Sequence, residues 1–278
     1  MFGLRALLRL PICILDLGAL RGKRPPRFPI ACNQFQIDLH AASLGASSAF
    51  LRRASCRPAR AKSRSAESNF ADNEGVIKLP EFADPSALGE LRLLLEATPG
   101  YEEWYSSGSS PNFSFGTLDN KILGSLVRNP SELETLVEVA LNGDPWLVGV
   151  QASALRDSGS PEERSEAALG FHCDADYVNF VKLFVPLQAL SEDECTQFVL
   201  GSQRGPKHAL YRVVDTSFSD RPIWRTRVEL GDCYLMCTSG WHSASARAEP
   251  RLVLVALFST DLFGMGSATA VPISEALH

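Results

Sequence analysis

One stretch of the sequence, residues 171–187, constrains the fold of this chain more than any other. It reads FHCDADYVNFVKLFVPL, in which a His-x-Asp pair, His172 and Asp174, is followed by an almost unbroken apolar run. An apolar run of this length predicts a strand in the core of a sheet. Side chains alternate along an extended strand, so His172 and Asp174 are expected to point the same way.

His172 and Asp174 provide two of the three protein ligands that a metal site needs. A third ligand is expected on a neighbouring strand far away in the sequence, and His242, in Gly-Trp-His, is the candidate. Two histidines and one carboxylate leave three coordination positions open on one side of Fe(II), which suits a co-substrate and O2.

Several other apolar segments, separated by Gly and Pro turns, predict short strands. The predicted strands cover residues 75–82, 146–155, 181–190, 196–200, 225–230, 232–238 and 251–258. Many short strands of this kind are typical of a double-sheet jelly roll, the cupin-like double-stranded β-helix. The fold class is therefore expected to be mainly β with flanking helices.

Two helices are predicted before most of these strands. Asp84-Pro85 supplies an N-cap and a Pro at the first helical position, and a leucine stripe follows up to residue 95. Asn129-Pro130 begins the second helix, and Asn142-Gly143 ends it. Both helices are expected to cover the outer face of the jelly roll. Residues 101–120 are expected to form a loop, which could line a cavity or pack on the surface.

Charge divides the chain into two parts. Residues 1–66 contain 12 Lys and Arg against two Asp, a net charge of +10, whereas residues 67–278 contain 15 against 30 acidic residues. A basic, acid-poor, Ser- and Ala-rich leader resembles a transit peptide, although a disordered extension explains it equally well. We expect residues 67–278 to form the folded domain. The location is organellar, in a plastid or mitochondrion, if the leader is a transit peptide, and cytoplasmic otherwise.

Composition also excludes several classes of protein. The acidic domain has no affinity for nucleic acid that its charge could explain, and no apolar stretch is long enough to span a bilayer. The seven cysteines lack CxxC spacing, so neither a zinc finger nor a disulfide framework is indicated. The sequence leaves the oligomeric state open.

The order of motifs after the His-x-Asp pair resembles that of one enzyme family. An apolar strand, a Gly201-Ser202-Gln203 turn, a Gly231-Asp232 turn, His242 and Arg251 follow in sequence. This order is similar to the phytanoyl-CoA dioxygenase-like family of Fe(II)/2-oxoglutarate oxygenases, over residues 75–260. The family usually has His at the position of Gln203, which leaves the role of that position open.

The resemblance implies a function and a set of site residues. His172, Asp174 and His242 would bind Fe(II), and Arg251 would hold the far carboxylate of 2-oxoglutarate through its guanidinium fork. The enzyme would hydroxylate a small organic substrate with O2, convert 2-oxoglutarate to succinate and CO2, and could use ascorbate as a reductant. The presence of Asp174 argues against a halogenase, in which a small residue replaces the carboxylate.

Each proposed co-substrate residue also has an ordinary structural explanation. Arg251 could instead point to solvent or pair with Glu249. Lys182 could add positive charge near the co-substrate or extend to the rim of the barrel, and Phe184 could contact the co-substrate or only pack in the core. Ser243 or Ser245 could supply the hydroxyl that relatives often carry two residues after the second histidine, where this chain has Ala244.

A non-catalytic jelly-roll protein that binds a metal or another ligand is the alternative from a different class. The joint presence of the three ligands and Arg251 favours the enzyme, because a binding protein would not need the whole set. Substrate contacts are expected on the loops 101–120, 152–170 and 203–224.

Removal of residues 1–66 is expected to leave the folded domain intact, because that segment lacks the apolar periodicity of a core element. Thermal unfolding of the truncated and full chains should give midpoints within about 2 °C, a shift that corresponds to at most about 1 kcal/mol for a domain of this size. Loss of soluble, cooperatively folding protein after truncation would show that the segment belongs to the domain.

Overall fold

The computed structural model describes residues 74–108, 110–141, 143–157, 169–174, 180–204, 218, 221–245, 249–260 and 270–278. The predicted leader, residues 1–66, lies outside the described residues, as do parts of the predicted substrate loops 152–170 and 203–224. No helix among the described residues has both the length and the apolar character needed to cross a membrane.

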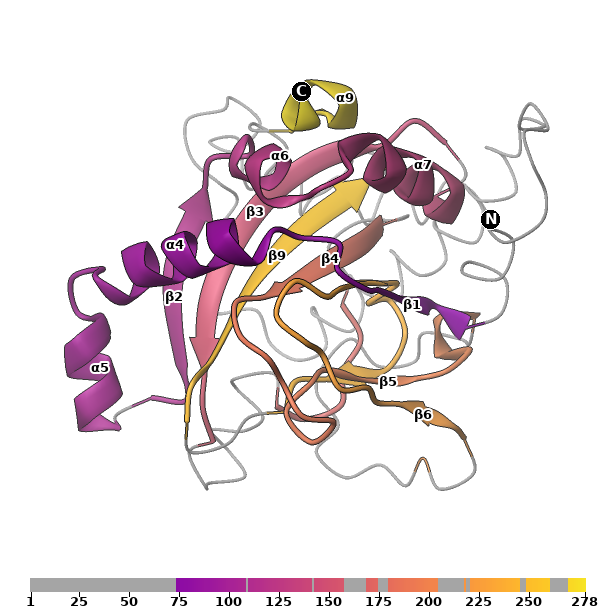
Figure 1. Cartoon of the computed structure of the whole chain (residues 1–278). Coiled ribbons are helices and arrows are strands. Elements are labelled where there is room, and N and C mark those ends of the chain that lie inside the picture. The colour runs from indigo at the N-terminus through magenta and orange to yellow at the C-terminus, as the bar shows by residue number, and fades with distance from the viewer. Residues whose placement is uncertain are drawn as a thin grey trace, which may run out of the picture.

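Two antiparallel sheets form the framework (Figure 1). The larger sheet has the order β1-β7-β4-β9-β3-β10, with β2 also paired to β3, and the smaller has the order β6-β5-β8. The strands of the larger sheet are β1 (Val76–Leu79), β2 (Asn112–Leu118), β3 (Trp146–Leu155), β4 (Phe180–Pro186), β7 (Cys233–Met236), β9 (Arg251–Ser259) and β10 (Val271–Pro272). Those of the smaller are β5 (Gln197–Val199), β6 (Ile223–Trp224) and β8 (His242–Ser243).

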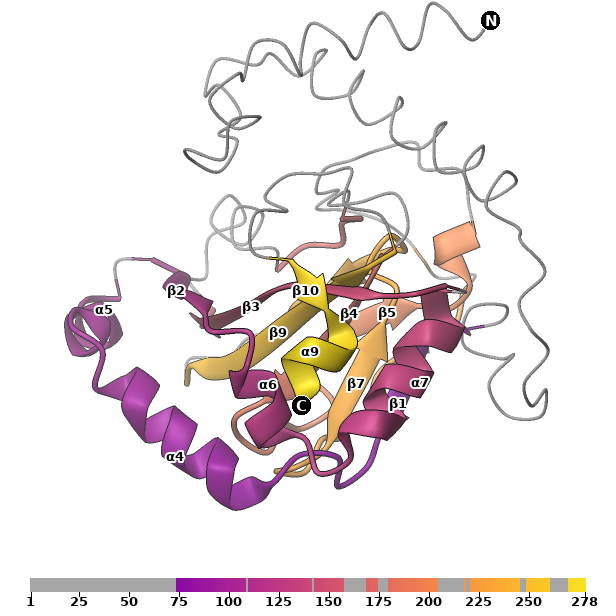
Figure 2. The same cartoon turned by 90° about the horizontal axis from the view of Figure 1, so that it is seen from above.

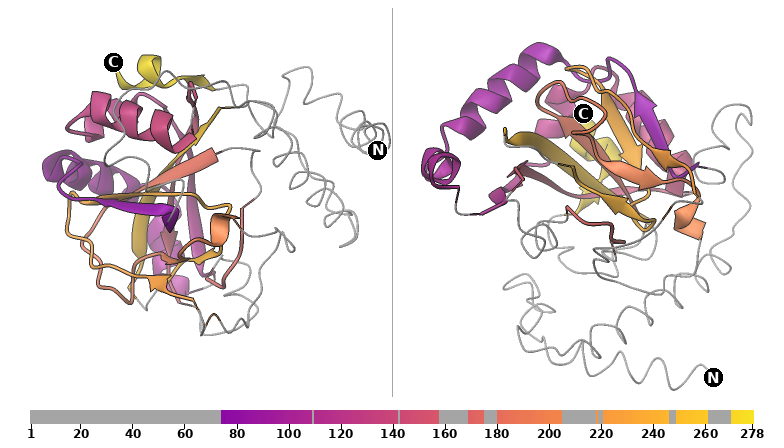
Figure 3. Two further views of the ribbon diagram at one scale, coloured as in Figure 1. Left: turned by 90° about the vertical axis from the view of Figure 1, so that its right-hand side faces the viewer. Right: turned by 90° about the horizontal axis from the view of Figure 1, so that it is seen from below.

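The helices lie on one side of the larger sheet (Figure 2). They are α4 (Pro85–Glu96), α5 (Tyr101–Ser107), α6 (Ile122–Leu126), α7 (Pro130–Leu141) and α9 (Ile273–Leu277), and a 3-10 turn, η2 (Ser202–Arg204), follows β5. The smaller sheet lies on the other side of the larger one, away from α7 and α9 (Figure 3). This arrangement confirms the predicted jelly roll with helices on its outer face.

Strand alternation gives the larger sheet two apolar faces. Leu183 and Leu254 pack outward with leucines of α4 and α7 in the main core. Phe184, Tyr234 and Val253 face inward, where they meet Phe198 of the smaller sheet in a second cluster. The larger sheet is therefore buried on both faces, which is why β4 and β9 read as continuous apolar runs.

The predicted helices are confirmed at both of their starts. Asp84 caps α4, because its carboxylate accepts hydrogen bonds from the backbone N–H groups of Ser86 at 2.7 Å and Ala87 at 3.3 Å. Asn129 does the same for α7, where its side chain accepts from the N–H of Glu132 at 3.2 Å.

Residues 101–120 do not form the expected loop. They hold the helix α5 and the strand β2, which pairs with β3 from Asn112↔Leu155 to Leu118↔Val150. Aromatic packing explains the difference, since Tyr101 and Trp104 of α5 are buried against Phe113 of β2 at ring distances of 5.5 and 5.6 Å. These contacts are tertiary, so the local Ser-rich sequence did not indicate them.

The predicted strand at 225–230 is also wrong. The strand of the smaller sheet lies just before it at β6, and within 225–230 only Val228 forms a bridge, with Leu190. Arg225, Arg227 and Glu229 alternate as in a strand, but they are exposed and have no partner strand among the described residues. The short elements α6, β10 and α9 were not predicted, because none is long enough to show a clear period.

The Gly231-Asp232 turn ties the start of α4 to the strands. Gly231 adopts a φ of +101° and its carbonyl accepts from the N–H of Ala83 at 2.8 Å. The Asp232 carboxylate accepts from Lys78 at 2.8 Å and from the N–H of Glu81 at 2.9 Å. Two chain segments that are far apart in sequence are joined at this turn.

Gly231→Ala is expected to destabilise the fold by about 1–3 kcal/mol, because an L-residue is strained at this φ and its Cβ would lie 3.0 Å from the Ala83 carbonyl oxygen. Chemical denaturation measures the change. Gly89→Ala, inside α4 with nothing within 4 Å of the new Cβ, is the matched control and should instead stabilise by about 0.5–1 kcal/mol. Equal effects of the two substitutions would contradict this account.

Candidate metal centre

Backbone hydrogen bonds bring the two histidines side by side. The N–H of His172 donates to the carbonyl of His242 at 2.8 Å, and the N–H of His242 donates back at 2.9 Å. Residues that oppose each other in an antiparallel pair point to the same face, so both imidazoles lie on one side. Asp174 joins them because its N–H donates to the carbonyl of Thr238 at 2.8 Å.

The three side chains converge. One donor atom from each of His172, Asp174 and His242 lies within 4.8 Å of the others, and these residues are the one such group among the described residues. Asp174 Oδ1 lies 3.5 Å from His172 Nε2, and Oδ2 lies 3.4 Å from His242 Nε2. Adjacent ligands of a metal at about 2.1 Å stand about 3 Å apart, so these separations fit one ion with little movement.

The rings are oriented so that each Nε2 can bind a metal. Nδ1 of His172 lies 2.9 Å from the carbonyl oxygen of Gly170, and Nδ1 of His242 lies 3.0 Å from that of Gly240. A carbonyl can only accept, so each Nδ1 carries the proton and each Nε2 presents a lone pair. This orientation by outer hydrogen bonds is typical of metal-binding histidines.

The electrostatics favour a neutral His172 and an ionised Asp174. Burial, with the neighbouring His242, lowers the pKa of His172 to about 4, so its ring is neutral at pH 7. Burial alone would raise the pKa of Asp174, but the ammonium group of Lys182, 2.7 Å from Oδ2, lowers it well below its usual value. A neutral imidazole and an ionised carboxylate are the forms of these side chains that bind a divalent ion.

Lys182 lies beside the carboxylate of Asp174, the acidic member of the candidate metal centre. Its Nζ is 2.7 Å from Asp174 Oδ2, and strand β4 places it on the inward face together with Phe184. Its predicted roles, near the co-substrate or at the rim, did not include this salt bridge. The contact holds the carboxylate against the two imidazoles.

Arg251 is buried at the start of β9, with only 2% of its surface exposed. Nη1 donates to the carbonyls of Glu194 at 2.9 Å and Ser245 at 3.2 Å, Nη2 lies 3.4 Å from Thr196 Oγ1, and Nε has no partner. No described acidic side chain pairs with it, so it neither points to solvent nor binds Glu249. A buried guanidinium that contacts only neutral oxygens favours a nearby anion.

The remaining predicted residues occupy different positions. Phe184 stacks on Tyr234 with ring centroids 5.0 Å apart and planes 10° apart, on the inward face. Ser243 pairs with Gln197 across β5 and follows His242, so alternation turns it to the opposite face. Its predicted contact with a co-substrate stays a prediction that this register does not favour.

The predicted turn at Gly201-Ser202-Gln203 packs against the segment that carries His242. Ser202 Oγ accepts from the N–H of Trp241 at 2.8 Å, and a Cβ on Gly240 would approach Ser202 Oγ to 2.7 Å. The side-chain amide of Gln203 is buried without a hydrogen-bond partner. The turn is visible in the sequence, whereas these contacts depend on how the loops meet in space.

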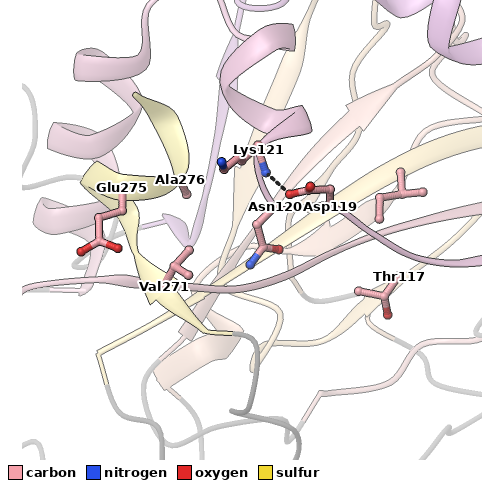
Figure 4. A pocket seen from close by; sticks show the side chains of 8 residues that line it. Thr117, Asp119, Asn120, Lys121, Val271, Glu275 and Ala276 are labelled. Carbon is pink, nitrogen blue, oxygen red and sulfur yellow. Dashed lines mark hydrogen bonds between the residues drawn. The ribbon is translucent and has the colours of Figure 1, made fainter.

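A hollow of about 350 Å³ lies elsewhere, between the end of β2 and α9 (Figure 4). Asp119, Lys121 and Glu275 border it, and Asp119 accepts from the backbone N–H of Lys121 at 3.0 Å. It contains no histidine or cysteine. Among the described residues, the candidate metal ligands therefore lie in the barrel and not in this hollow.

Comparison with known proteins identifies the fold. No family model and no curated protein sequence matches the chain. Among solved structures, iron-bound HygX from Streptomyces hygroscopicus is similar with a TM-score of 0.52 and 15% identity, over 73% of this chain and 89% of that one. HygX with nickel and 2-oxoglutarate gives 0.51 and 14% over the same shares.

A second protein gives the same result. EctD from S. alaskensis, with 2-oxoglutarate and 5-hydroxyectoine, is similar with a TM-score of 0.50 and 10% identity, over 72% of this chain and 79% of that one. At these identities the likeness shows the fold, and the chain shares the jelly roll of HygX and EctD.

Asp174→Asn is expected to weaken binding of a divalent ion at least tenfold, about 1.4 kcal/mol or more, because the only charged ligand is lost and Lys182 then repels the ion. Titration with Co(II) or with Fe(II) under anaerobic conditions measures this. Asp119→Asn, at the unrelated hollow, is the control and should bind as the unchanged chain does. Equal metal affinity in the two variants would rule out Asp174 as a ligand.

Proposed function

We propose that this protein is a non-haem Fe(II)- and 2-oxoglutarate-dependent dioxygenase that hydroxylates a small organic substrate. One observation carries the proposal: a His-Asp-His ligand set and a buried arginine without a carboxylate partner among the described residues face the interior of one barrel.

The spacing between the two features suits a short dicarboxylate. Phe198 is opposite His242 in the smaller sheet, and Thr196, which contacts Arg251, lies two residues before Phe198. Two residues of a strand span about 7 Å. The guanidinium is therefore separated from the metal ligands by about two residues of strand, the distance between successive inward-facing side chains. 2-oxoglutarate would bridge this distance, with its oxo-acid end at the metal and its far carboxylate at Arg251.

The residues of the chain have separate roles in this proposal. His172, His242 and Asp174 would hold Fe(II), Lys182 would fix the carboxylate of Asp174, and Arg251 would orient the co-substrate. Bound iron would supply the activation of O2, and the overall balance is 2-oxoglutarate, O2 and R–H to succinate, CO2 and R–OH. Phe184 and its apolar neighbours would exclude water from the interior.

The comparisons support the proposal through the fold. HygX and EctD have the same jelly roll, and structures of them contain iron, or nickel with 2-oxoglutarate, or 2-oxoglutarate with 5-hydroxyectoine. The order of motifs from His172 to Arg251 further supports a place in the phytanoyl-CoA dioxygenase-like family. Because the metal ligands and Arg251 are present together, catalysis is favoured over binding alone.

The test is formation of succinate from 2-oxoglutarate by the purified chain with Fe(II), O2 and ascorbate. Turnover is expected with the unchanged chain. Arg251→Lys keeps the charge but loses the two-pronged geometry, so the apparent affinity for 2-oxoglutarate should fall at least tenfold, about 1.4 kcal/mol, with metal affinity unchanged.

Three results bear on the proposal. Failure of the metal-loaded chain to bind 2-oxoglutarate would refute the co-substrate. Binding without succinate formation in the presence of candidate substrates would favour the non-catalytic alternative. An unchanged 2-oxoglutarate requirement in Arg251→Lys would remove that residue from the site and make Lys182 the next candidate.

A further inference from the structure

Lys182 occupies a position in the larger sheet where a charge is costly to bury. Its strand, β4, lies between β7 and β9, and Lys182 is opposite Met236 on one side and Leu257 on the other. Met236 is fully buried, and Nζ of Lys182 lies 6.0 Å from the centre of the Phe180 ring. Only 18% of the Lys182 side chain is exposed. A lysine among apolar neighbours in a central strand requires an anion, and the carboxylate of Asp174 supplies it.

Both oxygens of the Asp174 carboxylate face the candidate metal centre. Oδ1 is 3.5 Å from Nε2 of His172, and Oδ2 is 3.4 Å from Nε2 of His242. A carboxylate placed in this way can bind one metal ion through a single oxygen or through both. The positions of the two imidazoles therefore do not decide between these two modes of binding.

The mode of binding determines how many coordination positions remain for the reaction. Two imidazoles and one carboxylate oxygen leave three positions of a six-coordinate ion open, whereas two imidazoles and two carboxylate oxygens leave only two. A chelating 2-oxo acid occupies two positions. O2 can then bind the ion only if the carboxylate uses a single oxygen.

Lys182 already occupies one of the two oxygens. Its Nζ donates to Oδ2 of Asp174 at 2.7 Å, and among the described residues no other side chain outside the ligand set hydrogen-bonds to this carboxylate. A hydrogen bond between an ammonium group and a carboxylate is among the strong ones, because both partners are charged. Oδ2 is thereby held by Lys182, and Oδ1 remains for a metal ion.

We infer that Lys182 is a positioning residue that keeps Asp174 bound to the metal through Oδ1 alone, so that a third coordination position stays open for O2. The inference rests on the proposed function and deepens it. Stability alone does not require this pair, since a buried ion pair can often be replaced by apolar side chains without loss of stability. Its place beside the metal carboxylate instead gives Lys182 a role in the reaction.

Lys182→Met tests the inference, because methionine fills a similar volume without the charge or the hydrogen bond. The full chain is loaded with Fe(II) without O2 and titrated with 2-oxoglutarate and then with nitric oxide, which binds where O2 would bind. Absorbance reports both steps. The Kd for nitric oxide should rise at least about tenfold in Lys182→Met, because the freed Oδ2 fills the third position, while the Kd for 2-oxoglutarate should stay within about twofold.

The affinity for the metal gives a second readout, measured by titration with Co(II). It should stay equal or increase in Lys182→Met, because Oδ2 becomes a ligand and the repulsion between the ammonium group and the ion is removed. A residue that only maintained the local structure would instead weaken the metal and both small ligands together when it is replaced.

Lys78→Met is the matched control. Lys78 also lies in a strand of the larger sheet and forms an ion pair, with Asp232 at 2.8 Å, but this pair does not involve a candidate metal ligand. It should change none of the three affinities. Lys182→Gln, whose side chain is uncharged and one atom shorter, carries the test if Lys182→Met does not fold, and it should give the same pattern as Lys182→Met.

The outcomes separate the inference from the proposed function. An unchanged affinity for nitric oxide in Lys182→Met, or parallel loss of metal, 2-oxoglutarate and nitric oxide binding, would overturn the inference and leave the proposed function intact. Loss of 2-oxoglutarate affinity alone would place Lys182 at the co-substrate and would likewise overturn it. Failure of the unchanged Fe(II)-loaded chain to bind 2-oxoglutarate would overturn the proposed function, and the inference with it.

Discussion

The pair of backbone hydrogen bonds between His172 and His242 holds the candidate site together. The bonds, 2.8 and 2.9 Å long, join two segments that are remote in sequence, and the same pairing turns both imidazoles to one face. The carbonyls of Gly170 and Gly240 then fix the ring orientations. Because the pairing of His172 with His242 joins remote segments, it forms only in the folded chain, and metal binding at these residues should therefore stabilise the fold.

Strand alternation divides the larger sheet into a structural face and a functional face. Outward residues such as Leu183 and Leu254 bury the helices, and inward residues include Lys182, Phe184 and Arg251. The two inward-facing cations differ in their partners. Lys182 is paired with Asp174, whereas Arg251 has only neutral acceptors among the described residues. A buried cation with too few hydrogen-bond acceptors destabilises the protein when no anion is bound. Binding of an anion removes this destabilisation, which increases the affinity for the anion.

The residues that precede His242 are held in place by the turn at Ser202. The turn at Ser202 holds the peptide of Trp241, and Gly240 leaves no room for a side chain because its Cβ would meet Phe198 and Ser202 at 2.7 Å. His242 is therefore fixed on both sides, by its pairing with His172 and by this turn. Such support matters because a ligand that is displaced by even about 0.5 Å no longer meets the productive geometry.

The sequence by itself determined the jelly roll, the helices α4 and α7, and the candidate metal ligands. The helices and strands depend on local patterns, whereas His242 was indicated by the order of motifs along the chain. Capping residues, apolar runs and the spacing of His172 and Asp174 are all visible in the chain. Tertiary structure alone decided that residues 101–120 form α5 and β2, that Lys182 pairs with Asp174, and that Tyr234 and Thr196 meet beside Arg251. These features depend on which faces of remote strands oppose each other, and strand register across two sheets is not encoded in any local period.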